Sequence, residues 1–129
     1  MPLDRTALLA CSGKRYKDVE LDGIGTVRIQ SLTEGERNEI ELKQFDRSGK
    51  RDNSKLKELK ANWIVGCVVD EHGAKEFSEA DVTSILKMDS RITDALFEAI
   101  QSHVGLTQAD RRRLLKNSQE TEGDASLSV

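Results

Sequence analysis

Hydrophobic and polar residues alternate most regularly close to the N-terminus. Val27 and Ile29 are each flanked by polar residues, and this period of two is typical of a half-buried strand. The sequence Asp-Gly-Ile-Gly at 22–25 comes just before them, and its glycines accept the positive φ angles of a tight turn. The pattern therefore predicts a β-hairpin with strands at about 16–22 and 26–31.

Apolar residues take a helical spacing in the middle of the chain. A helix that begins at Ser54 would present one continuous apolar face, made of Leu56, Leu59, Trp63 and Cys67. Nearly every residue from 63 to 69 is apolar. This stretch is either a helix buried on all sides or a helix that gives way to a short strand, and periodicity leaves both open.

Capping residues place the other helices. Thr33 and Glu36 have the spacing of a capping box, and Ser78 and Asp81 repeat it. Gly105 follows a long apolar stripe and predicts the end of that helix. We expect further helices at 2–11, 33–45, 78–87, 89–104 and 107–116, a polar loop at 46–53, a turn at 70–73 and a short return strand at 74–77.

These elements predict an α+β fold: a predominantly helical single domain with one β-hairpin near the N-terminus. We expect the globular domain to span residues 1–117. Residues 118–129 are rich in Ser, Glu, Gly and Asp, so we expect a disordered polar tail whose removal costs almost no stability. The expected core consists of Val27, Ile29, Leu56, Leu59, Trp63, Cys67, Ile85, Leu86, Ile92, Leu96 and Ile100.

Composition narrows the function classes. The 129 residues include 20 basic and 23 acidic ones, for a net charge of −3, which is a poor starting point for bulk binding to phosphates. There is no apolar run near 18 residues and no basic flank leading into a long apolar stretch, so we expect no membrane span and a cytosolic location. The two cysteines are expected to be reduced thiols.

Candidate catalytic chemistry is sparse. Asp70, Glu71 and His72 are adjacent, but neighbouring residues of a turn seldom converge on one ion, so we interpret them as a solvated turn. Cys67 lies on the expected core face and is interpreted as a small hydrophobe. His103 is interpreted as a helix-surface residue. We therefore expect no enzymatic activity, no metal site and no cofactor.

Two basic runs are candidates for binding a partner. One spans 47–57, and the other combines basic and apolar side chains: Arg111, Arg112, Arg113, Lys116, Leu114 and Leu115. Acidic residues are interspersed and no aromatic residues interleave for base stacking, so a solvated or protein-binding face is favoured. The alternative is a small nucleic-acid-binding regulatory protein that uses runs 47–57 and 111–116.

The order of the motifs is more specific than any one of them. A glycine turn and strand run into a helix that opens Leu-Thr-x-x-Glu-Arg, and a later Val-Asp-Glu-x-Gly turn precedes Phe-Ser-x-x-Asp-Val. The matching segments are 19–29, 32–37, 68–73, 77–82 and 116–118. With these motifs the chain resembles the tail assembly chaperone family of long-tailed bacteriophages over about residues 3–118. The polar loop at 46–53 departs from the family pattern.

The resemblance implies a non-enzymatic role in the host cytoplasm. Such chaperones coat the helix-rich tape measure protein, keep it soluble, help to recruit tail tube subunits and are absent from the mature virion. Tape measure protein and tail tube protein are thus the implied partners, and self-association is a further option; membrane and nucleic acid are not expected. The family also implies a longer form made by ribosomal frameshifting, for which codons 115–117 are the expected slippery run.

Overall fold

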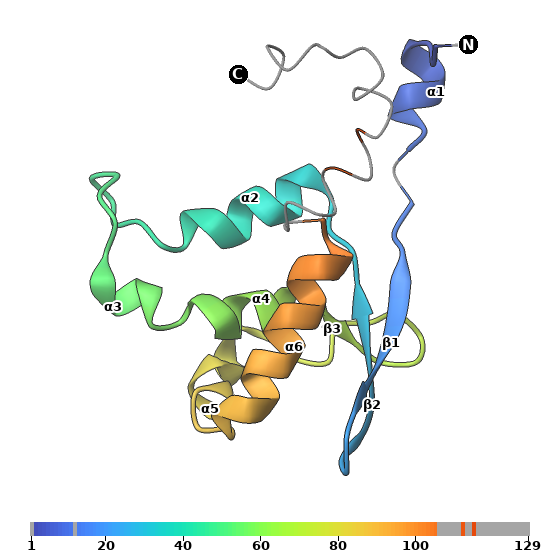
Figure 1. The fold of residues 1–129 in the computed structure, drawn as a ribbon. Helices are drawn as coiled ribbons and strands as arrows, with labels where there is room; N and C mark the ends of the chain where they lie inside the picture. Colours follow the sequence, from blue (N-terminus) through green and yellow to red (C-terminus); the bar gives the residue numbers. More distant parts are fainter. Residues whose placement is uncertain (1, 12, 106–111, 113–114, 116–129) are drawn as a thin grey trace.

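The predicted hairpin forms, and a third strand extends it to an antiparallel sheet in the order β1-β2-β3 (Figure 1). The computed structural model describes residues 2–11, 13–105, 112 and 115. The elements are α1 (Arg5–Leu9), β1 (Tyr16–Leu21), β2 (Gly25–Gln30), α2 (Glu34–Leu42), α3 (Asn53–Leu56), α4 (Leu59–Cys67), β3 (Val68–Val69), η1 (Glu79–Asp81), α5 (Val82–Ile85) and α6 (Ser90–His103). This arrangement confirms the α+β class.

The hairpin has the register that its apolar residues demand. Val19 pairs with Val27, so both lie on the same face of the sheet. Gly23 has a φ of 77° in the connecting turn, and the amide of Ile24 donates to the carbonyl of Leu21 at 2.9 Å. The glycine turn and the alternation of apolar and polar residues thus produce the predicted hairpin.

Helix α4 forms the centre of the core. Every residue from 61 to 67 is buried, and the chain then continues directly into β3. Both interpretations of the apolar stretch are therefore correct in part, because a helix buried on all sides gives way to a two-residue strand. The helix packs against α2, α5 and α6, and the buried amide of Gln30 donates to the carbonyl of Gly66 at 2.9 Å.

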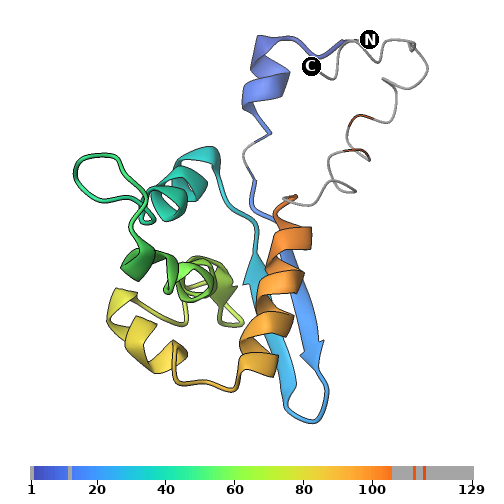
Figure 2. The same ribbon diagram turned by 60° about the vertical axis from the view of Figure 1, so that its left-hand side comes forward.

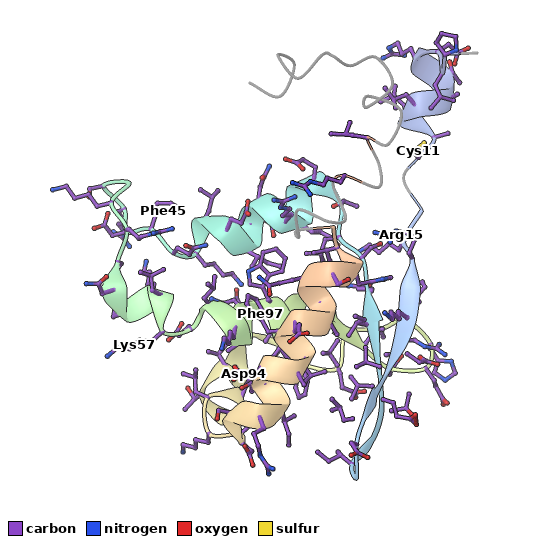
Figure 3. All side chains as sticks on the ribbon, in the orientation of Figure 1. Cys11, Arg15, Phe45, Lys57, Asp94 and Phe97 are labelled. Carbon is purple, nitrogen blue, oxygen red and sulfur yellow. The ribbon has the colours of Figure 1, made fainter. Side chains whose placement is uncertain are left out.

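Helix α6 runs alongside the hairpin, as Figures 1 and 2 show. Its cap is Asp89, which accepts a bond from the amide of Arg91 at 2.9 Å. At its other end the guanidinium of Arg15 donates to the carbonyl of His103 at 2.9 Å, and the ring Nε2 of His103 lies 3.0 Å from the carbonyl of Arg15. Figure 3 shows Arg15 beside this end of the helix. These bonds hold α6 along the sheet. Leu96 and Ile100 are the buried residues of this helix.

The capping box of α2 forms as predicted. The amide of Glu36 donates to the hydroxyl of Thr33 at 3.2 Å, and the Glu36 carboxylate accepts from the amide of Thr33 at 2.9 Å. The same carboxylate binds the ammonium of Lys14 at 2.6 Å. Partial burial alone would raise the pKa of Glu36, but these bonds outweigh it and hold that pKa below its usual value. The start of α2 is thereby tied to the segment before β1.

Helices α2 and α4 approach closely at a glycine. A methyl group added at Gly66 would lie 2.6 Å from Cδ1 of the buried Ile40. Gly66→Ala therefore gains about 1 kcal/mol of helix propensity and loses about 1–3 kcal/mol to overpacking. We expect a net loss of up to about 2 kcal/mol in the free energy of unfolding, measured by urea denaturation.

A double-mutant cycle tests this contact. Ile40→Val removes the obstructing Cδ1 and by itself costs about 0.5–1.5 kcal/mol. The double variant Ile40→Val/Gly66→Ala should lose less free energy of unfolding than the sum of the losses of the two single variants, by about 0.5 kcal/mol or more. Strict additivity would contradict the close approach of α2 and α4.

Several sequence predictions need correction. The continuous helix expected from Ser54 is interrupted after Leu56 and forms two helices, α3 and α4. Leu56 and Leu59, which were expected in the core, are only half-buried. The helix expected at 78–87 is a 3-10 turn followed by the four-residue α5. Leu86, predicted to lie in the core, is 50% exposed, since the helix ends before it. The return strand at 74–77 is a single bridge from Lys75 to Val69.

The segment 46–53 contains a turn that one carboxylate organises. Asp46 accepts bonds from the amides of Ser48 at 2.8 Å and Lys50 at 3.0 Å, and Phe45 pairs with Arg51 across the turn. The helix expected at 107–116, the boundary at 117 and the tail at 118–129 fall largely or wholly outside the described residues.

Candidate partner-binding groove

An apolar groove of about 660 Å³ lies between the hairpin turn, the turn after β3 and the first half of α6. Its floor is made of the buried Val68, Val69 and Leu96. Its walls are half-buried or exposed apolar side chains, namely Ile24, Val27, Phe77, Met88 and Ile92. A cleft of this size with apolar walls is typical of a binding site.

The shortness of β3 creates the groove. This strand pairs with β2 only at Arg28 and Ile29, so in the described part of the chain the rest of that β2 edge has no strand beside it. The chain turns away at Asp70, whose carboxylate accepts bonds from the amides of His72 at 2.8 Å and Ala74 at 3.0 Å. These backbone bonds hold the pKa of Asp70 below its usual value, so the turn carries a fixed negative charge.

The rim of the groove is acidic. Four carboxylates line it, those of Asp18, Asp70, Glu71 and Glu76, together with one guanidinium, that of Arg28. The guanidinium is already engaged, because its Nε binds the Asp18 carboxylate at 2.9 Å and its Nη1 donates to the carbonyl of Glu71 at 2.9 Å. The bond to Asp18 also raises the pKa of Arg28. The rim therefore presents uncompensated negative charge around apolar walls.

A second apolar surface lies on α1. Leu8 and Leu9 are 61% and 62% exposed, and this helix buries no residue. Figures 1 and 2 show α1 standing away from the sheet and from α4. Asp4 caps it by accepting from the amide of Ala7 at 2.8 Å. The helix is thus locally stabilised but has no packing partner among the described residues.

Only part of the predicted basic site can be placed. Arg112 and Leu115 are exposed, while Arg111, Arg113, Leu114 and Lys116 lie outside the described residues. In the run 47–57, Lys55 donates to the carbonyl of Phe45 at 3.2 Å. Asp46 and Asp52 lie within or next to this run and keep their pKa values low through bonds to Ser48 and Ser54, which weakens its positive field.

The turn at 70–73 forms as predicted, with Asp70 used by the backbone and His72 exposed. Sequence reasoning proposed no residue of the groove as a site. It interpreted Ile24 only as part of a turn and Val27 as core. One signal was present, because an isoleucine between two glycines places a large apolar side chain at a turn position that is usually polar.

The two cysteines differ in reactivity. Cys11 is exposed and Cys67 is fully buried. Burial, and to a lesser degree the charge of Glu36, raises the pKa of the Cys67 thiol to about 12. Since the fold keeps this thiol neutral, its contribution to stability is present below the ordinary thiol pKa of about 9 and is lost as the pH rises toward 12.

We expect iodoacetamide at pH 8 to label one thiol per native chain and two per unfolded chain. Burial raises the pKa of the Cys67 thiol far above this pH and so keeps it protonated and unreactive, and the side chain is also inaccessible. The count is read by mass spectrometry, with Cys11→Ser as the control that should remain unlabelled when native. Fast labelling of both thiols in the native chain would contradict the buried position of Cys67.

Comparison with known proteins gives one informative likeness. No family model matches the chain, and no curated protein matches it. Among solved structures, the tail assembly chaperone of bacteriophage HK97 matches with a TM-score of 0.54 and 15% identity, over 74% of this chain and 94% of that one. The two chains share a fold. The resemblance drawn from the sequence motifs is thereby confirmed at the level of the fold.

Among the described residues, no helix has the length and apolar character needed to cross a membrane.

Proposed function

We propose that this chain is a phage tail assembly chaperone that binds the tape measure protein and keeps it soluble. The observation that carries the proposal is the fold shared with the HK97 tail assembly chaperone. In this proposal the chain also helps to recruit tail tube subunits and is absent from the mature virion. Its role is non-catalytic and is carried out in the host cytoplasm.

The exposed surfaces support a binding role. A chaperone for a long helical protein needs exposed apolar surfaces, which the groove and α1 supply. It must also stay soluble when no client is bound, which the carboxylates around the groove favour. The basic run Arg111 to Lys116 is proposed as a further contact surface, and self-association as a means of covering an extended client.

Co-expression tests the proposal. Fragments tiling the tape measure protein of the same phage should move from the pellet to the supernatant when this chain is co-expressed, and should co-purify with it. The control is an unrelated acidic protein of similar size at the same expression level. Equal precipitation of every fragment with and without the chain would contradict the proposed function.

The gene offers an independent test of a longer form. We propose frameshifting at or near codons 115–117, because Leu-Lys-Asn can be encoded by a run on which both tRNAs re-pair after slipping back one base. A switch there would leave the domain before it unchanged and alter only the residues after it. Codons that cannot re-pair anywhere in the last thirty or so positions would exclude it.

A further inference from the structure

We infer that the groove binds a segment of the partner in which apolar side chains are flanked by Lys or Arg. That the partner is the tape measure protein rests on the proposed function; the chemistry of the segment rests on the groove alone. The two parts of that chemistry, the apolar centre and the basic flanks, come from separate features of the site.

The basic flanks follow from the charges on the rim. Glu71 and Glu76 are exposed, and within the described residues no Lys or Arg forms an ion pair with either carboxylate. The Glu71 carboxylate lies 3.5 Å from the exposed imidazole of His72, and the nearby Arg28 guanidinium donates to the backbone carbonyl of Glu71 and not to its carboxylate. The one guanidinium lining the groove is held by Asp18. An incoming cation would meet unpaired carboxylates, and an incoming carboxylate would be repelled.

The apolar centre follows from the walls. Ile24 is 61% exposed at the hairpin turn, and Phe77 and Met88, which line the same groove, are half-buried. Burying such side chains against a partner is favourable, and methionine adapts its shape to different apolar groups. A volume of about 660 Å³ accommodates a few side chains rather than a whole domain. The site therefore suits one short segment.

The charge component can be tested on the full chain with a defined probe. The probe is a fluorescently labelled 18-residue peptide with leucines at helical spacing and lysines between them; a second peptide has glutamates in place of the lysines. Anisotropy should show saturable binding of the lysine peptide and much weaker binding of the glutamate peptide. Glu71→Gln/Glu76→Gln should weaken binding of the lysine peptide about threefold to tenfold.

The matched control for charge is Glu39→Gln/Glu98→Gln. These residues are also exposed and lie outside the groove, so the variant loses the same two charges elsewhere. Its affinity should equal that of the wild type. Equal weakening by both double variants would overturn the inference, because it would show a response to net charge alone.

The apolar component has its own pair of variants. Ile24→Ser should weaken binding by about tenfold or more, since it removes a groove wall. Leu42→Ser should not, although Leu42, at the end of α2, is 65% exposed and thus slightly more exposed than Ile24. Unchanged binding by Ile24→Ser would overturn the inference, and circular dichroism confirms that each variant is folded.

The same variants separate this inference from the proposed function. If the wild type binds the lysine peptide through the groove but solubilises no tape measure fragment, the groove chemistry holds and the proposed function fails. If tape measure fragments are solubilised equally by the wild type and by Ile24→Ser, the proposed function holds and the groove is not its site.

Discussion

Replacing Trp63 with alanine should lower the free energy of unfolding by about 3–5 kcal/mol. Trp63 is 3% exposed and lies in α4, in which every residue from 61 to 67 is buried. The large loss is expected because α4 packs against both α2 and α6, so the cavity left by the indole cannot easily collapse. Urea denaturation measures the change. It is followed by circular dichroism, because Trp63 is the one tryptophan in the sequence and its replacement removes the tryptophan fluorescence signal.

The control is Trp63→Phe, which keeps an aromatic ring at the site and should lose much less. A nearly unchanged midpoint for Trp63→Ala would contradict the buried position. In that case Trp63 would be exposed in solution and would become a candidate anchor for a partner.

Ile100→Ala should cost about 2–5 kcal/mol in the free energy of unfolding. Ile100 is fully buried on α6, which packs against α4 and β1. The matched control is Leu86→Ala, another truncated aliphatic side chain. Leu86 is 50% exposed, so its change should stay within about 0.5 kcal/mol.

Comparing these two variants tests where the core ends. A loss at Leu86 as large as that at Ile100 would contradict the end of α5 at Ile85 and restore the core predicted from the apolar pattern. Chemical denaturation at one temperature is sufficient, with the m-value confirming that both variants unfold from a comparably compact state.

The local features were predictable because the residues that determine them are close in the sequence. The capping box of Thr33 and Glu36 needs residues three positions apart, and the hairpin needs a glycine turn between two alternating stretches. Asp89 and Gly105 mark the ends of α6 in the same way. Such signals act within one turn of chain, and tertiary contacts did not override them.

The features that the sequence left open, or that were predicted wrongly, depend on tertiary contacts. No local pattern decides whether the apolar residues 63–69 end in a strand, because the edge of β2 supplies the partner. The end of α5 at Ile85 left Leu86 outside the core, although it is as apolar as its neighbour. Ile40 entered the core without being predicted, because Gly66 allows α2 to approach α4.

The groove could not be assembled from the sequence for the same reason. Asp18 and Glu71 are 53 positions apart in the printed sequence, and Arg28 brings them together by binding both. The site predicted from the sequence is a continuous run at 111–116 of four basic and two apolar residues, because adjacency is visible in a sequence and convergence is not.

Light scattering with purified components tests whether this chain keeps the tape measure protein soluble. Tape measure fragments diluted from denaturant should scatter less light as the purified chain is added, and the effect should saturate at a fixed molar ratio. Ile24→Ser should need a higher ratio, and Leu42→Ser should match the wild type. Scattering that is unchanged at every ratio, or suppressed equally by an unrelated acidic protein of the same size, would contradict the account.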